Sequence, residues 1–197
     1  MAKRTFDLFF SIPGIIILSP LLLIVALAVR LDSPGPVIFR SRRVGRFGKE
    51  FVLLKFRTMT KDAPLKGPTI TIGNDPRITR LGAFLRRSKI DELPQLLNVI
   101  KGEMGLVGPR PEVPEYVRLY TPEQSAVLNL VPGITDPASI KYAQESELLG
   151  ASESPETSYV QHVMPDKILM NLEYAGRASA WTDFLLVLKT LARIIQR

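Results

Sequence analysis

The chain of 197 residues is long enough for one domain with a sizeable core but short for two. Its net charge of +7 and pI near 9.8 favour anionic partners: phosphorylated small molecules, lipid headgroups or nucleic acid. The absence of cysteine excludes disulfides and thiolate catalysis, and the single histidine, His162, argues against histidine triads and multi-histidine metal sites.

A long apolar segment follows the basic start of the chain. Residues 8–29 carry no charge, and a helix of about 22 residues would match the thickness of a bilayer core. Basic residues flank both ends, so a spanning helix satisfies the positive-inside preference poorly in either orientation. Ser19-Pro20 lies near the middle, where proline removes a backbone hydrogen bond and a serine hydroxyl can satisfy the freed carbonyl. Two topologies stay open: a spanning helix, or a bent re-entrant helix with both ends in the cytosol.

A strand pair is predicted next. Residues 37–39 and 50–56 have the composition of strands, and a basic loop with Gly45 and Gly48 joins them. A hairpin would bring Lys55 close to the arginines of that loop. Such a cluster can bind phosphate, or it can form a patch that contacts anionic lipid.

An irregular excursion over residues 61–74 precedes a predicted helix over residues 77–87. Ile78, Leu81, Phe84 and Leu85 form its expected inward face. Arg86 belongs to the basic face, which is either an ordinary solvated surface or part of a phosphate site.

The adjacent acids Asp91 and Glu92 are the focus of the sequence. They lie just before or within the first turn of a helix that ends at Gly102, where peptide dipoles stabilise a carboxylate and can receive a phosphate oxygen. The acids can also be ordinary charges at a helix start. Alternatively, Ser88 and Asp91 form a capping pair, which moves the start of the helix back.

Two rigid loops and an amphipathic helix complete the pattern. Arg110 lies between Pro109 and Pro111, whose restricted backbone reduces the entropy lost in presenting a guanidinium to phosphate. Residues 132–135 form the second loop. The helix predicted over residues 183–197 is either interfacial or packed on the core.

Taken together, these motifs resemble the bacterial sugar transferases, the small monotopic phosphoglycosyl transferases that start lipid-linked glycan assembly. The resemblance runs in order through nearly the whole chain and rests on the following segments: Lys3-Arg4-Thr5-Phe6-Asp7, Ser19-Pro20, Ser33-Pro34-Gly35-Pro36, Lys55-Phe56-Arg57-Thr58-Met59, residues 75–82, Asp91-Glu92-Leu93-Pro94-Gln95, Gly108-Pro109-Arg110-Pro111 and Pro132-Gly133-Ile134-Thr135.

The resemblance implies a mixed α/β fold, mainly helical with a small antiparallel hairpin or sheet. Residues 1–30 would form a re-entrant membrane helix bent at Ser19-Pro20, with Pro20 as helix breaker. Residues 31–197 would form a catalytic domain in one structural unit with that anchor. The expected location is the cytoplasmic face of the bacterial inner membrane, in contact with membrane lipid.

The resemblance also implies a reaction: transfer of a sugar-1-phosphate from a UDP-sugar to polyprenol phosphate, usually undecaprenyl phosphate, with Mg²⁺ as cofactor and release of UMP. This is the first membrane step in assembling exopolysaccharide, O-antigen, capsule or glycoprotein glycans. Nucleic acid is not an expected partner, and a homodimer stays open. By position, the implied roles are nucleophile for Asp91, metal-associated acid for Glu92, phosphate ligands for Lys55, Arg86 and Arg110, and nucleotide or sugar loop for Pro132, Gly133, Ile134 and Thr135.

Two mechanisms are considered for this reaction. In the favoured one, Asp91 attacks the sugar-bearing phosphate and forms an aspartyl phospho-sugar, which the prenyl phosphate then attacks. In the other, Asp91 acts as a general base in a ternary complex. The second is disfavoured because a phosphate dianion needs no deprotonation.

The sequence departs from the common family pattern at two places. After Pro132-Gly133-Ile134-Thr135 the usual Gly, apolar residue, Ala and Gln are replaced by Asp136-Pro137-Ala138-Ser139, and Asn171 stands where many members have an acid. Both departures bear on sugar identity. The alternative outside the enzyme class is a non-catalytic basic module for membrane surfaces or nucleic acid, which leaves the Asp-Glu pair and the proline-flanked arginine unexplained.

Overall fold

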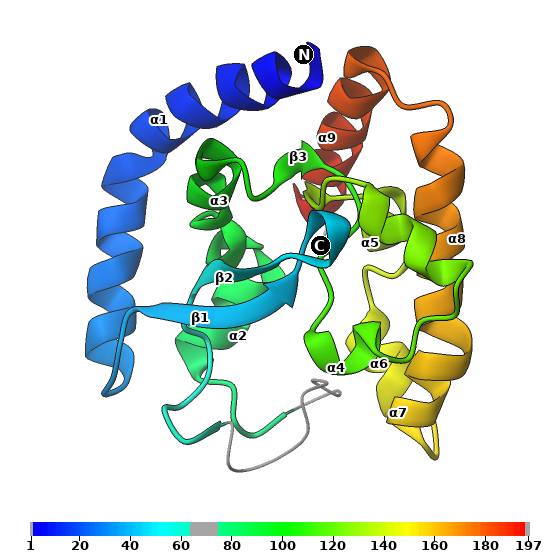
Figure 1. Ribbon diagram of the computed structural model, residues 1–197. Coiled ribbons are helices and arrows are strands. Elements are labelled where there is room, and N and C mark those ends of the chain that lie inside the picture. The colour runs from blue at the N-terminus through cyan, green and yellow to red at the C-terminus, as the bar shows by residue number, and fades with distance from the viewer. Residues whose placement is uncertain (1, 64–74, 196–197) are drawn as a thin grey trace.

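The computed structural model describes residues 2–63 and 75–195 and, over these residues, is mainly helical with two two-stranded sheets (Figure 1). The predicted mixed, mainly helical class with an antiparallel hairpin is confirmed. Most of the excursion expected at residues 61–74 lies outside the described residues. In chain order the elements are α1 (Ala2–Asp32), β1 (Ile38–Val44), η1 (Arg46–Gly48), β2 (Glu50–Phe56), α2 (Arg80–Arg87), η3 (Ile90–Glu92), α3 (Gln95–Lys101), β3 (Gly105–Val107), α4 (Pro114–Val117), η4 (Gln124–Asn129), β4 (Gly133–Thr135), α5 (Pro137–Lys141), α6 (Glu145–Gly150), α7 (Pro155–Ser158), the π-helix η5 (Tyr159–Val163), α8 (Met164–Ala175) and α9 (Ala180–Ile195).

Helix α1 is continuous although Pro13 and Pro20 lie within it. Figure 1 shows it bent about midway, so that it curves around one side of the protein. The Ser19 hydroxyl donates to the Ile16 carbonyl at 2.7 Å, which is the group that Pro20 leaves without a helical N–H partner. The expected serine-to-carbonyl bond is therefore confirmed, and the helix bends without breaking.

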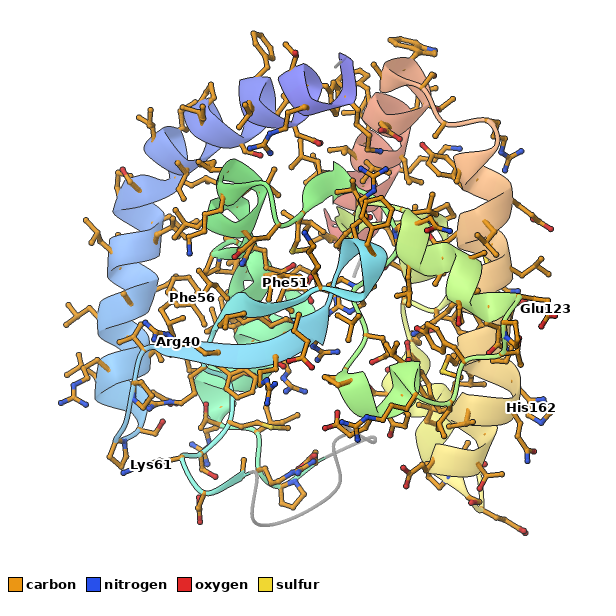
Figure 2. The ribbon with its side chains drawn as sticks, viewed as in Figure 1. Arg40, Phe51, Phe56, Lys61, Glu123 and His162 are labelled. Atoms are coloured by element: carbon orange, nitrogen blue, oxygen red, sulfur yellow. The ribbon has the colours of Figure 1, made fainter. Side chains whose placement is uncertain are left out.

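One face of α1 packs on the protein and the other is exposed. Val25 and Val29 are buried in a cluster with Phe56 of β2, which points toward α1 (Figure 2), and Leu85 of α2. Elsewhere, side chains such as Phe9, Ile17 and Leu23 are 69%, 75% and 71% exposed. The most apolar window of Lys3–Asp32 has a mean hydropathy of 2.7 and is only 11% buried. By length and composition this helix can enter a membrane.

The first turns of α1 are held by polar contacts with three separate elements. Lys3 pairs with Asp183 of α9 at 2.8 Å, and Arg4 donates to two carbonyls in the last turn of α3 at 2.5 and 2.8 Å. Carbonyls in the last turn of a helix lack their full set of helical partners, so a guanidinium is a suitable cap there. The buried carboxylate of Asp7 accepts the Leu106 N–H of β3 at 2.9 Å.

The last turn of α1 is held by Arg57, directly after β2. This arginine is 7% exposed and donates to the carbonyls of Val29, Ser33 and Pro34 at 3.1, 2.5 and 3.1 Å. Both ends of α1 are thus attached to the same globular unit.

The first strand of the hairpin is longer than the sequence pattern predicted. β1 and β2 pair antiparallel from Ile38 opposite Phe56 to Val44 opposite Glu50. The basic residues expected in a loop, Arg42 among them, therefore lie in β1, because pairing with β2 continues through them.

Asn98 of α3 attaches the hairpin to the centre of the molecule. Its side-chain amide accepts the Leu54 N–H at 3.1 Å and donates to the Val52 carbonyl at 2.7 Å. Asn98 is completely buried, so this side chain fixes β2 relative to α3.

Helix α2 begins three residues later than predicted. Thr79 is its N-cap, and the threonine Oγ1 accepts the Gly82 N–H at 2.9 Å. Phe84, predicted to face inward, is 60% exposed. The inward face of this short helix is narrow and is formed by Leu81 and Leu85.

A short parallel pair, β3 with β4, was not predicted. Gly105 lies opposite Gly133 and Val107 opposite Thr135. The two segments approach closely beyond the pair, where a Cβ on Gly108 would collide with the Val131 carbonyl and a Cβ on Gly133 with the Gly108 backbone. Glycine is needed here because two backbones meet.

The C-terminal half encloses a second core and ends in an amphipathic helix. That core is formed by side chains from α4, η4, α6 and the η5–α8 segment, among them Tyr116, Val127, Leu149 and Met164. Helix α9 lies beside the first turns of α1 (Figure 1), and the rings of Phe10 and Phe184 stack with centroids 6.2 Å apart. The outer side of α9 is apolar and exposed at Trp181, Leu185, Leu188 and Leu191.

Candidate active site

The two acids lie in a 3₁₀ turn ahead of the helix. Lys89, with a left-handed φ of 58°, starts this turn, and α3 begins only at Gln95. The Ser88 hydroxyl donates to two carbonyls in the last turn of α2. The alternative capping pair of Ser88 with Asp91 is therefore wrong, because Ser88 ends one helix and does not start the next.

Glu92 is an ionised carboxylate shared by two cations. Its Oε1 accepts Lys55 Nζ at 3.0 Å and Arg110 Nη2 at 2.8 Å, and its Oε2 accepts Arg110 Nη1 at 3.3 Å. Burial acts to raise the pKa of Glu92, but Arg110 and Lys55 outweigh it and hold that pKa well below its usual value. Glu92 thereby joins β2 to the loop that follows β3.

The environment of Asp91 differs from that of Glu92 and shifts its pKa in the opposite direction. It is 5% exposed, and its Oδ1 has no hydrogen-bond partner among the described residues. Burial raises the pKa of Asp91, while Lys55 opposes that shift. A buried carboxylate oxygen without a donor is costly, so its place is explained best by a ligand that reaches it.

The cations have pKa values set by their surroundings. Burial, followed by the charge of Arg110, lowers the pKa of Lys55 from 10.5 to about 8. The nearby charge of Glu92 raises the pKa of Arg110. Arg86 donates through Nε to Thr58 Oγ1 at 2.8 Å, and burial lowers its pKa while Asp91 opposes that shift.

All of these residues face one open groove of about 1770 Å³. The structure therefore brings together the two acids and the three basic residues that were predicted from the sequence: Asp91, Glu92, Lys55, Arg86 and Arg110. They come from β2, α2, η3 and the loop after β3, which are distant in sequence.

In addition to the two flanking prolines, several hydrogen bonds fix the backbone around Arg110. The Pro109 carbonyl accepts the Gly133 N–H at 3.0 Å. Glu112 is held by Arg43 at 3.3 Å, by the Val113 N–H at 2.9 Å and by the Tyr159 hydroxyl. These contacts fix the base of the loop from both sides.

A polar lobe of the groove was missed by sequence reasoning. Lys167 of α8 pairs with Glu145 of α6 and lies 5.2 Å from the ring centre of Tyr159 and 5.8 Å from that of Tyr142. The Tyr142 hydroxyl donates to Asp166 at 2.7 Å. These residues fall in the interrupted stretch around residues 141–165 and the start of α8, where no local pattern predicted that distant side chains would meet.

The loop Pro132-Gly133-Ile134-Thr135 contributes less to the groove than the resemblance implied. Pro132 lines the groove, whereas Gly133 and Thr135 are buried in the strand pair, and Thr135 Oγ1 is bonded to Thr190 at 2.7 Å. Ile134 packs against the core cluster around Leu53. The loop mainly supports the Arg110 backbone.

The two departures from the family pattern meet in space. Asp136 is 1% exposed and caps α5 by accepting the Ser139 N–H at 2.9 Å. Asn171 Nδ2 approaches the same carboxylate at 3.4 Å. Both residues line the groove, and the charge of Asp136 contributes to the raised pKa of Arg110.

The acidic pair also bears on the expected magnesium ion. Among the residues that the structure describes, no group of three or more acidic or histidine side chains could hold a metal. Mg²⁺ commonly binds to one or two carboxylates together with substrate phosphates, and the unpartnered Asp91 Oδ1 beside Glu92 fits that donor set. Both Glu92 oxygens, however, are already bonded to cations.

The groove thus combines basic side chains with the buried Asp91 carboxylate, whose Oδ1 has no partner among the described residues, in a protein that also carries an exposed apolar helix. The family described as bacterial sugar transferase matches residues 1–197, and the chain belongs to this family.

Relatives of known description share most of this chain. It is 37% identical to an exopolysaccharide production protein PSS of Rhizobium leguminosarum bv. phaseoli, over 99% of this chain and 96% of that one. It is also 37% identical to a UDP-glucose:undecaprenyl-phosphate glucose-1-phosphate transferase of Caulobacter vibrioides, over 99% of this chain and 70% of that protein. A UDP-N-acetylgalactosamine-undecaprenyl-phosphate N-acetylgalactosaminephosphotransferase of Aeromonas hydrophila is 35% identical over 98% of this chain and 43% of its own length. The last two names specify different sugars, so similarity alone does not identify the sugar.

Proposed function

We propose that the protein transfers a sugar-1-phosphate from a UDP-sugar to undecaprenyl phosphate, releases UMP and thereby starts assembly of a glycan on a membrane lipid. The observation that carries this proposal is the buried Asp91 Oδ1, which has no partner among the described residues and lies within a cationic groove. Relatives named for this class of transfer support the choice of substrates.

The first step follows from the contrast between the two acids. An Asp91 oxygen forms a bond to the sugar-bearing phosphorus, and the bond from that phosphorus to the bridging oxygen breaks, so the electron pair leaves with UMP. Lys55, Arg86 and Arg110 offset the repulsion between carboxylate and diphosphate. Mg²⁺, held by Asp91 and Glu92 together with the donor phosphates, would supply further charge neutralisation.

In the second step, an oxygen of the prenyl phosphate bonds to the same phosphorus and the bond to Asp91 breaks. The free carboxylate is regenerated, and the product is prenyl-diphospho-sugar. The covalent route is favoured over general-base catalysis because Asp91 has an oxygen free to bond to phosphorus, while a phosphate dianion has no proton to lose.

The attachment of α1 supports a monotopic, re-entrant arrangement. Its first turns contact α3, β3 and α9, and its last turn is capped by Arg57. A straight helix of 31 residues would be about 46 Å long, and its ends could not both contact one globular unit on one side of a bilayer. The bend allows this, and under the proposal the groove lies at the cytoplasmic surface of the membrane.

The test is the intact mass of the detergent-solubilised protein after mixing with Mg²⁺ and a panel of UDP-sugars, without lipid acceptor. We expect a stoichiometric burst of UMP and an added mass equal to one phospho-sugar, which also names the sugar. If UMP appears only after prenyl phosphate is added, and no adduct forms, the ternary-complex mechanism replaces the covalent one. No UMP with any donor, with or without lipid, would reject the function.

A further inference from the structure

The cations that should bind the donor phosphates are already paired within the protein. Lys55 and Arg110 both bond to Glu92, and between them they contact both of its oxygens. Glu92 is therefore not available to a metal ion in this state. This observation is separate from the unpartnered oxygen of Asp91, on which the proposed chemistry rests.

We propose that Lys55 and Arg110 block metal binding at Glu92 until the diphosphate of the donor takes the place of Glu92 as the counter-ion of these two cations. The metal ion then binds to Glu92 only after the donor, and the donor binds without needing the metal ion. This ordering rests on the proposed function, because it takes a nucleoside diphosphate as the group that competes for the cations.

Electrostatics favour this order. A divalent cation that approaches Glu92 in the free protein meets two positive charges bonded to that carboxylate, and it must displace at least one of them. A diphosphate is negatively charged, so the same two cations attract it. The planar guanidinium of Arg110 can bind a phosphate as well as a carboxylate. Once the phosphates engage the cations, Glu92 and the phosphate oxygens together form a suitable magnesium site.

The structure also indicates which cation moves. The side chain of Arg110 is 37% exposed, whereas that of Lys55 is 16% exposed and extends from a paired strand. Because the Arg110 backbone is fixed between prolines, its guanidinium can turn from Glu92 into the groove without movement of the chain. Arg110 is thus the exchanging partner, and Lys55 remains near the acid.

Binding of Mn²⁺ to the metal-free, full-length protein, followed by electron paramagnetic resonance, tests the block without any sugar donor. We expect weak binding by the wild type and a gain of at least about tenfold in Arg110→Gln, equivalent to about 1.4 kcal/mol. A gain of affinity cannot result from misfolding. Arg86→Gln is the matched control, because it also removes a positive charge near Asp91, but from a side chain that donates to Thr58 Oγ1.

Two outcomes would overturn the block: wild type that binds Mn²⁺ as tightly as Arg110→Gln, or an equal gain in Arg86→Gln, which would reflect overall charge alone. Titration calorimetry with UDP in the presence of EDTA tests the order. We expect the wild type to bind UDP without metal. Binding of UDP that requires metal would overturn the ordering alone, whereas no binding of UDP under either condition would overturn both the ordering and the proposed donor.

Discussion

The outer face of α1 exposes apolar side chains, whereas the groove around Asp91 buries charged ones. Ile17 and Leu23 on α1 are more than two-thirds exposed, while the carboxylates of Asp91 and Glu92 are 5% and 8% exposed. Exposed apolar area and buried charge are both unfavourable in a protein that stands alone in water. Under the proposed function, the difference means that each region is arranged for a different partner: a lipid phase for α1 and a phosphate ester for the groove.

The largest effect is expected at the unpartnered carboxylate. Asp91→Asn should reduce UMP release by at least about 10³-fold and abolish the phospho-sugar adduct, because the amide is a poor nucleophile toward phosphorus. Quenched-flow analysis of UMP and intact mass measure both effects. Glu50→Gln is the control, since Glu50 is an exposed carboxylate paired with Arg42 on the hairpin. Near-normal turnover in Asp91→Asn would remove Asp91 from the chemistry.

The second largest effect is expected at Phe56, where the hairpin packs on α1. Phe56→Ala should lower the free energy of unfolding by about 3–5 kcal/mol, because Phe56 is 3% exposed and packs on Val25 and Val29 of α1. Chemical denaturation in detergent, followed by circular dichroism, measures this loss. Phe39→Ala, at a position 46% exposed on the same hairpin, should change stability by less than about 1 kcal/mol. Equal losses in both variants would mean that α1 does not depend on this contact.

The charge of the groove should make donor binding pH-dependent. The pKa of Lys55 is lowered from 10.5 to about 8, so its cation is present below pH 8 and is lost as the pH rises through that value. The Kd for UDP should therefore rise by about tenfold per pH unit above pH 8. Calorimetric titrations between pH 7 and 9.5 measure this slope.

Lys55→Arg provides the control for that slope, because arginine keeps its charge over the whole range. A flat profile in this variant, with binding retained, would assign the titration to Lys55. The same slope in wild type and Lys55→Arg would assign it to another group.

The smallest effect is expected at the lipid side. Trp181→Ala on α9 should weaken binding to vesicles by about threefold to tenfold, because a 66% exposed tryptophan beside α1 is suited to a bilayer interface. Co-sedimentation with vesicles of bacterial phospholipids measures the partitioning. Leu148→Ala on α6, 53% exposed and far from α1 in Figure 1, should have no effect. Equal losses would show that α9 is not specially placed.

Local patterns in the sequence predict some of these features well. The uncharged run of α1, the Ser19-Pro20 bend and the second strand are visible because each depends on neighbours along the chain. Proximity of Asp91, Arg86 and Arg110 could be anticipated from their flanking motifs.

Other features depend on contacts that no local pattern contains. The strand pair β3–β4 has three residues per strand, and a Cβ at Gly108 or Gly133 would collide with the opposite backbone. The acids fall in a 3₁₀ turn because Lys89 adopts a left-handed conformation, which helix periodicity did not reveal. The lobe around Lys167 is formed by residues of the interrupted segment that meet only after folding.

The cap at the end of α1 has a mechanical consequence. Arg57 donates to the carbonyls of Val29 in the last turn of that helix and of Ser33 just after it, and is two residues from Lys55 on the same chain segment. If α1 sits in the bilayer, its depth sets the height of the Lys55 ammonium group above the hydrocarbon. In a thinner or thicker membrane the enzyme would then move as a whole with the lipid surface, and the distance from that surface to the Asp91 carboxylate would stay constant.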